Sequence, residues 1–300
     1  MSEMAQDQLP LRRRGTLEIF DVALKLYKRY FVPLIVWSMV ASLAQFAGMR
    51  LPAAGWIITI AVAPIAIGSV ACCLAAAVHG RDISIKESWD FLFKRYGSVL
   101  HVYILCGLIA FILLFALMIV ISVFAYFVIM LFSQLLSSSD AASLLGAVGV
   151  VVAALCASVF FACLFAWMGM TPLALCLEGD GKDNGRFLRR TYDLMRGNWW
   201  RIFGIVSMVG LAILGLVIIL MGMASVIIGL GTLKEITSGH LSPDDLSRLI
   251  AGYVGSFSLV SILWSPFYYL ALGLQYLDLR VRKEALDLEW AAQEEPAELA

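Results

Sequence analysis

The chain has 300 residues, of which 61% are hydrophobic and only 15% are charged, and its mean hydropathy is +0.89. A water-soluble domain does not carry this balance, and the net charge of zero leaves no basic excess for a nucleic-acid partner. The composition therefore excludes a soluble enzyme, a secreted domain and a nucleic-acid-binding protein. It predicts an all-α integral membrane protein.

Six apolar runs, with Arg201 near the start of the fifth as their one Lys, Arg, Asp or Glu, are long enough to be transmembrane helices, which need about 20 apolar residues to cross a core of about 30 Å. They cover residues 31–49, 53–78, 97–136, 141–177, 199–231 and 251–277. The third and fourth runs are long, and we expect each to form one helix that tilts or projects beyond the bilayer. All six spans are expected in a single membrane domain, residues 1–300, with flexible cytoplasmic tails at 1–14 and 291–300.

The basic residues predict the orientation, because short loops rich in Lys and Arg stay in the cytoplasm. With six spans, 19 of the 22 Lys and Arg residues lie on the side of the N-terminus. Only Arg50, Lys234 and Arg248 lie on the other side. Both termini are therefore expected in the cytoplasm. Charges at residues 18–28 interrupt the region before the first span, so we do not expect a cleaved signal peptide.

The segments that precede the first, third and fifth spans resemble one another. With Lys28, Lys94 and Arg196 in register, the KRY of residues 28–30 recurs at 94–96, and the third copy matches more weakly. We therefore expect three repeat units, at about 16–80, 83–180 and 185–290, each an amphipathic helix followed by a hairpin of two spans. Because each unit has two spans, the three copies point the same way.

Each of these amphipathic segments combines apolar and aromatic residues with basic residues at helical spacing. Such a helix suits the headgroup layer of a membrane, where aromatic rings are half wet and cations meet anionic lipid. The equally open alternative is that the helices pack on the cytoplasmic ends of the bundle. The candidate lipid or partner contacts are Lys28, Arg29, Tyr30, Lys94, Arg95, Tyr96, Arg196, Trp199 and Trp200.

Two further signals concern the helices themselves. Ser84 followed by Glu87 has the form of a capping box, and residues 242–245, SPDD, predict a short helix that leads into the sixth span. The second span of each unit contains a proline, at Pro64, Pro172 and Pro266. An interior proline removes a backbone hydrogen bond and usually kinks a helix, so we expect three kinks at comparable places.

Motifs for catalysis and for metal binding are missing from the sequence. There is no GxSxG, no HExxH and no complete phosphate loop, and we interpret GDGKDNG at residues 179–185 as a turn. No ionisable residue lies in a span away from its ends. The six cysteines fall in or at the ends of spans and are expected to be packing residues. We therefore expect no enzymatic activity, no cofactor and no metal.

Three stretches resemble a known family. They are GTLEIFDVALKLYKRYF at residues 15–31, RRTYDLMRGNWWRIFGI at 189–205 and LDLRVRKEALDLE at 277–289. Together they resemble bacterial polytopic membrane proteins related to the membrane domain of glycerophosphoryl diester phosphodiesterase. The resemblance implies a multi-pass protein of the bacterial inner (plasma) membrane. The catalytic barrel of the phosphodiesterase, with its acidic metal ligands and histidines, has no counterpart in this sequence.

These observations lead to two hypotheses for function. The preferred one is a non-enzymatic membrane protein that organises anionic phospholipid, or a partner membrane protein, through its basic aromatic helices. The alternative is a transporter or flippase of a lipid-like amphiphile. That alternative predicts a polar cavity among the second, fourth and sixth spans, lined by residues such as Ser69, Thr171 and Ser265.

Overall fold

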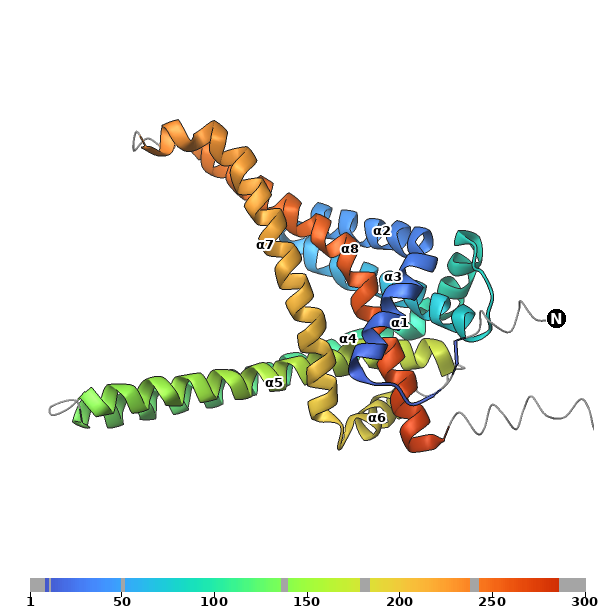
Figure 1. The fold of residues 1–300 in the computed structure, drawn as a ribbon, viewed down its shortest axis with the longest axis horizontal. Coiled ribbons are helices and arrows are strands. Elements are labelled where there is room, and N and C mark those ends of the chain that lie inside the picture. The colour runs from blue at the N-terminus through green and yellow to red at the C-terminus, as the bar shows by residue number, and fades with distance from the viewer. Residues whose placement is uncertain are drawn as a thin grey trace, which may run out of the picture.

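The computed structural model describes residues 9–10, 12–49, 52–135, 140–178, 184–237 and 243–285. Within these ranges the chain is all-helical and contains no strand (Figure 1). The helices are α1 Thr16–Arg29, α2 Phe31–Met49, α3 Pro52–Val78, α4 Ile85–Leu135, α5 Asp140–Glu178, α6 Asn184–Met195, α7 Trp199–Thr237 and α8 Pro243–Glu284. Most of the two predicted tails and most of the turn at 179–185 lie outside the described residues.

Four helices are long and apolar enough to cross a membrane. The candidate spans are Ile60–Val78, Ile85–Leu117, Ala157–Glu178 and Trp199–Leu220, and they coincide with the predicted second to fifth spans. The described apolar part of α2, Phe31–Ala44, is shorter. Spans one and six therefore stay predictions, whereas the expectation that the third and fourth runs each form one helix is confirmed by α4 and α5.

The helices form an inner and an outer group. In the spans of α3 and α5, 67% and 61% of the residues are buried, against 22% and 17% in those of α4 and α7. The inner helices α3, α5 and α8 contact one another pairwise. The outer α4 and α7 expose large apolar side chains such as Phe111, Phe115, Leu211 and Ile218. Apolar exposure on this scale is expected of a surface that faces lipid tails.

Each outer helix lies between two inner helices. α2 packs on α3 and α8, α4 on α5 and α3, and α7 on α8 and α5. The α4–α5 and α7–α8 hairpins diverge from the shared core (Figure 1). The core at their base is closely packed, since a Cβ at Gly273 of α8 would collide with Leu74 of α3, and one at Gly169 of α5 would lie 2.5 Å from Leu272. Glycine at these two positions allows the inner helices to approach.

The three amphipathic segments are helical, but they end in different ways. α1 ends at Tyr30, which is a turn residue, and α6 ends before Gly197, whose φ of +86° favours glycine. The second segment continues without a break into the span as α4, a helix of 51 residues. Gly97 does not break it, because no positive φ and no proline interrupts the chain there.

The predicted helix starts are confirmed with one difference. Ser84 and Glu87 form a reciprocal capping box, in which the Ser84 N–H donates to Glu87 Oε2 at 2.9 Å and the Glu87 N–H donates to Ser84 Oγ at 3.2 Å. The helix expected after residue 242 is not a separate short element. It is the first turns of α8, which runs unbroken from Pro243 to Glu284. Pro64, Pro172 and Pro266 lie inside α3, α5 and α8, the three inner helices.

Candidate membrane-interface site

The three aligned cations of the repeat are all exposed. Lys28 lies in the last turn of α1, Lys94 in the first turns of α4, and Arg196 just after α6. None of the three side chains makes an ion pair within the part of the chain that the structure describes. They are therefore available to an anion outside the protein.

The neighbouring Arg29 and Tyr30 contact the chain itself. Arg29 pairs with Asp82 at 3.0 Å, which joins the end of α1 to the loop before α4. Tyr30 is only 3% exposed, and its hydroxyl donates to the carbonyl of Arg81 at 2.8 Å. These contacts place both residues in the packing of the loop that follows α3.

Arg95 and Tyr96 are similarly engaged. The Arg95 guanidinium lies over the ring of Phe91, 4.6 Å from its centroid. The Tyr96 hydroxyl donates to the carbonyl of Ala61, three residues before Pro64. Tyr27, which sequence analysis did not select, donates in the same way to the carbonyl of Leu263, three residues before Pro266, at 2.8 Å.

These tyrosines donate to the turns that precede the prolines. A proline removes the N–H that would bond the carbonyl four residues before it, and its ring crowds that turn, where a hydroxyl from another helix can supply a hydrogen bond. Burial raises the pKa of Tyr27 to about 12, so its hydroxyl keeps the proton that it donates. Tyr27 of α1 and Tyr96 of α4 thus contact the turns of α8 and α3 that contain Pro266 and Pro64, and both side chains pack against the protein.

Exposed aromatic rings accompany the free cations. Trp89 and Phe93 lie on α4 one turn apart with ring centroids 4.1 Å apart, and both are substantially exposed. Trp200, at the start of α7, is 77% exposed, whereas Trp199 is half-buried and lies 6.0 Å from the ring of Tyr192. Amphipathic rings beside cations are typical of the membrane–water boundary.

A buried carboxylate joins the N-terminal segment to α7 and α8. Asp278 is fully buried and accepts hydrogen bonds from the backbone N–H of Arg14 at 2.6 Å and from Arg282 at 2.8 Å. It also pairs with Arg201 at 2.9 Å. The carbonyl of Arg14 in turn accepts hydrogen bonds from Arg201 and Arg282. Two cations and one backbone donor therefore compensate the buried charge.

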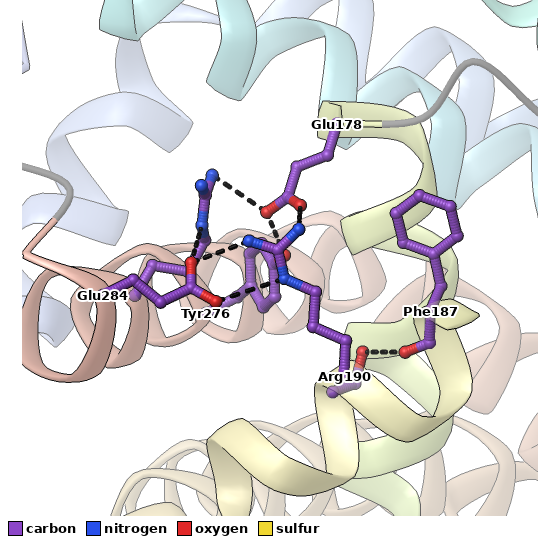
Figure 2. A network of polar contacts seen from close by, with 7 residues as sticks. Glu178, Phe187, Arg190, Tyr276 and Glu284 are labelled. Carbon is purple, nitrogen blue, oxygen red and sulfur yellow. Dashed lines mark hydrogen bonds and ion pairs between the residues drawn. The ribbon is translucent and has the colours of Figure 1, made fainter. Parts of the chain in front are cut away.

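A second ion cluster lies beside the first, on the same end of α8. Glu178 at the end of α5 pairs with Arg190 of α6 and, at 2.9 Å, with Arg280, and it accepts the hydroxyl of Tyr276 (Figure 2). Glu284 pairs with Arg190 at 2.7 Å and with Arg280 at 2.8 Å. Burial alone would raise the pKa of Glu284, but hydrogen bonds from Arg190 and Arg280 leave it below its ordinary value. This cluster fastens α5 and α6 to α8.

Sequence analysis found only part of these two clusters. The i, i+4 spacing of Arg280 and Glu284 is visible in the sequence, and the structure pairs them at 2.8 Å. The sequence analysis did not find Asp278 or Glu178, although polar residues alternate with apolar ones from Leu277 to Arg282. A helix that leaves the membrane into water is expected to become polar throughout. The apolar residues that continue among the polar ones could therefore have indicated that this end of α8 is packed within the protein.

The interior offers little polar chemistry. Ser69 and Thr171 donate to carbonyls of their own helices, Ala66 and Trp167, at 2.8 Å each, and Ser265 lies 3.2 Å from Ser38. The fully buried amide of Gln275 has no hydrogen-bond partner among the described residues. No group of three potential metal ligands occurs in that same part of the chain. The described cysteines are buried and free.

The fold and this site define the class of the protein. Four long apolar helices, an exposed apolar surface and charge clusters confined to one end of α8 belong to a helical membrane protein. The chain belongs to the family described as domain of unknown function DUF7847, which matches residues 22–271. The comparisons with curated proteins and with solved structures gave no match.

Proposed function

We propose that this protein is a non-enzymatic, multi-pass membrane protein that organises anionic phospholipid through one exposed, aligned cation in each of three repeats. Lys28, Lys94 and Arg196 carry the proposal, since they share one register, are exposed and lack an ion pair in the described chain. A cation near an anionic leaflet gains about 1 kcal/mol from the surface potential. Exposed aromatic rings occur close to two of them in the sequence, Trp89 and Phe93 before Lys94 and Trp200 after Arg196.

The repeat arrangement is part of this proposal. Three hairpins, α2–α3, α4–α5 and α7–α8, would each contribute an inner helix with a proline and an outer helix that also packs on the preceding unit. The cyclic contacts of α2 with α8, α4 with α3 and α7 with α5 support this arrangement. The amphipathic segments follow the same order, because α1 packs on α8, α4 on α3 and α6 on α5.

The topology follows from the same proposal. Six spans place both termini and all three free cations on the cytoplasmic face of a bacterial plasma membrane. The distribution of 19 of the 22 basic residues supports this orientation. We also propose that the chain is related to the membrane domain of glycerophosphoryl diester phosphodiesterase. A partner membrane protein is a further proposed binding partner of the same helices.

The transporter alternative has no observation that favours it in the described chain. It requires a polar cavity lined by Ser69, Thr171 and Ser265, and their hydroxyls are engaged in the contacts given above. The pockets found are lined by other residues. We therefore retain lipid organisation as the proposed function.

The test is native mass spectrometry of the purified chain in mixed micelles that hold equal amounts of phosphatidylglycerol and phosphatidylcholine. The measured quantity is the ratio of the two bound lipids. We expect a preference for phosphatidylglycerol that falls at least about fivefold when Lys28→Gln, Lys94→Gln and Arg196→Gln are combined, since each cation is worth about 1 kcal/mol, a factor of about five.

The matched control removes the same number of charges from ion-paired positions. Arg12, Lys25 and Arg29 pair with Glu18, Asp21 and Asp82, so their combined change to Gln should leave most of the lipid preference intact. Equal loss in both triple variants would show that net charge alone, and not the three free cations, sets the preference. An unchanged preference in the first variant would refute the proposal.

A further inference from the structure

An apolar groove with a volume of about 590 Å³ lies where α4, α5, α6 and α7 meet. This volume falls within the roughly 300–1,000 Å³ of sites that hold small ligands. Its lining includes Leu113, Phe160, Cys163, Trp167, Tyr192 and Trp199. The groove is therefore large enough for a ligand and is lined mainly by hydrocarbon and aromatic rings.

Two of the polar side chains that line the groove donate their hydrogens to the protein itself. The indole N–H of Trp167 donates to the carbonyl of Leu188 at 3.4 Å, and the thiol of Cys163 donates to the carbonyl of Trp199 at 3.9 Å. These contacts leave apolar surface facing the groove. An occupant is consequently held by burial of its own apolar surface.

Basic residues lie one turn from the α6 side of the groove. α4, α5 and α7 each contain a candidate membrane span, whereas α6 is amphipathic and basic. Arg189 and Arg196, both exposed, lie three residues before and four residues after Tyr192, which lines the groove. Arg189 is 3.9 Å from Asp193. An apolar site between membrane spans that ends at exposed guanidinium groups is complementary to a molecule with an acyl chain and an anionic head.

The comparable places in the other two units are filled by the protein's own rings. Where α2 meets α4, Trp37 stacks on Trp89 with ring centroids 5.0 Å apart. Where α1 meets α8, Phe20, Tyr27 and Trp264 surround Phe267. The groove beside α6 thus lies at a helix contact where the other two units bring aromatic rings together.

We propose that this groove binds one acyl chain of an anionic membrane phospholipid, whose phosphate lies beside Arg189 and Arg196. This inference deepens the proposed function, on which it rests, by naming a defined site for one lipid. It differs from the exchangeable lipid around Lys28 and Lys94, because the chain of the bound lipid lies in a groove lined by four helices.

The test is native mass spectrometry of the full chain after delipidation and exposure to phosphatidylglycerol. Leu113→Trp fills the groove, and Leu211→Trp adds the same ring to an exposed position of α7 that does not line it. Excluding one methylene from a buried site shifts binding about fourfold. We therefore expect the filled groove to lower the occupancy of the most tightly held lipid by at least about tenfold, and the control to retain it.

The remaining outcomes separate this inference from the function that it extends. Retention of that lipid by Leu113→Trp would overturn the groove assignment, while loss of lipid preference in the Lys28, Lys94 and Arg196 variant would still support the function. If the chain retained phosphatidylcholine and phosphatidylglycerol equally, and Arg189→Gln changed neither, the claim that the site selects an anionic headgroup would be wrong. Loss from the Leu211→Trp control as well would overturn the claim of a local site.

Discussion

Asp278 is the residue on which the charged end of α8 depends most. It is fully buried, and it compensates Arg201 and Arg282 while it accepts the backbone N–H of Arg14. Removing one partner of a buried pair leaves an uncompensated charge, at a cost of about 3–5 kcal/mol.

Asp278→Asn should therefore lower the free energy of unfolding in detergent micelles by about 3 kcal/mol. Asp21→Asn is the control, because Asp21 pairs with Lys25 while both side chains are more than half exposed. Such surface pairs contribute less than about 1 kcal/mol. A small loss for Asp278→Asn, similar to that of the control, would contradict the assigned role.

Glu284 gives the same region a pH dependence. Its pKa in the folded protein lies below the ordinary value of 4.5, despite the opposing effect of burial, because Arg190 and Arg280 donate hydrogen bonds to it. The stabilisation is therefore present above that ordinary value and is lost as the pH falls through the lower folded pKa. Thermal unfolding followed as the pH falls from neutral through the ordinary pKa should show a steeper loss for the native chain than for Glu284→Gln. Equal slopes would contradict this assignment.

At the residue scale, the sequence predicted the exposed cations and the Ser84–Glu87 cap because both depend on local spacing. It could not predict the partners of Tyr27 or Asp278. The carbonyl of Leu263 is 236 residues from Tyr27, and the N–H of Arg14 is 264 residues from Asp278. Such contacts are set by how the helices pack, and a single sequence carries no signal for that distance.

Among the elements, the proline-containing helices depend on hydroxyls from their neighbours. Tyr96→Phe removes the donor to Ala61 and should cost about 1 kcal/mol of stability. Pro64→Ala removes the ring that crowds this turn, so the Ala61 carbonyl can bond more closely to the N–H of Ile65 and the cost of Tyr96→Phe should fall by about 0.5 kcal/mol or more. A double-mutant cycle of unfolding free energies measures this coupling. A coupling of zero would mean that the tyrosine acts independently of the proline.

The close approach of the inner helices makes a second prediction at this scale. Gly273→Leu places a side chain against buried Leu74 and Leu173 and should cost about 1–3 kcal/mol or more through overpacking. Gly210→Leu in α7 is the matched control, since nothing lies within 4 Å of a Cβ there. The free energy of unfolding should fall for the first variant and stay nearly unchanged for the second. Equal tolerance of both would contradict close packing at Gly273.

The sequence predicted most element types correctly, because long apolar runs and the capping box have clear physical signatures. Spans two to five coincide with the candidate spans of α3, α4, α5 and α7. It did not indicate that the amphipathic segment at 85–96 continues into its span. Helix continuity at Gly97 depends on the backbone angle that the glycine adopts, and glycine permits either outcome.

At the scale of the whole molecule, the three repeat units would be held together in a cycle. Each outer helix contacts its own inner partner and the inner helix of another hairpin. The repeat register in the sequence indicated three related units, but not which unit packs on which. That order depends on the glycines and buried rings at the contacts, and it places Lys28, Lys94 and Arg196 in equivalent positions of the proposed cycle.

The most direct test of this account measures where those three positions lie. Single cysteines introduced at Lys28, Lys94 and Arg196 would be spin-labelled in vesicles that contain phosphatidylglycerol, and their depth measured from accessibility to oxygen and to a water-soluble relaxant. The unmodified chain, whose described cysteines are buried, controls for background labelling. We predict that all three labels lie at headgroup depth on the cytoplasmic face. A label on the opposite face, or one in bulk water away from the headgroups, would contradict the account.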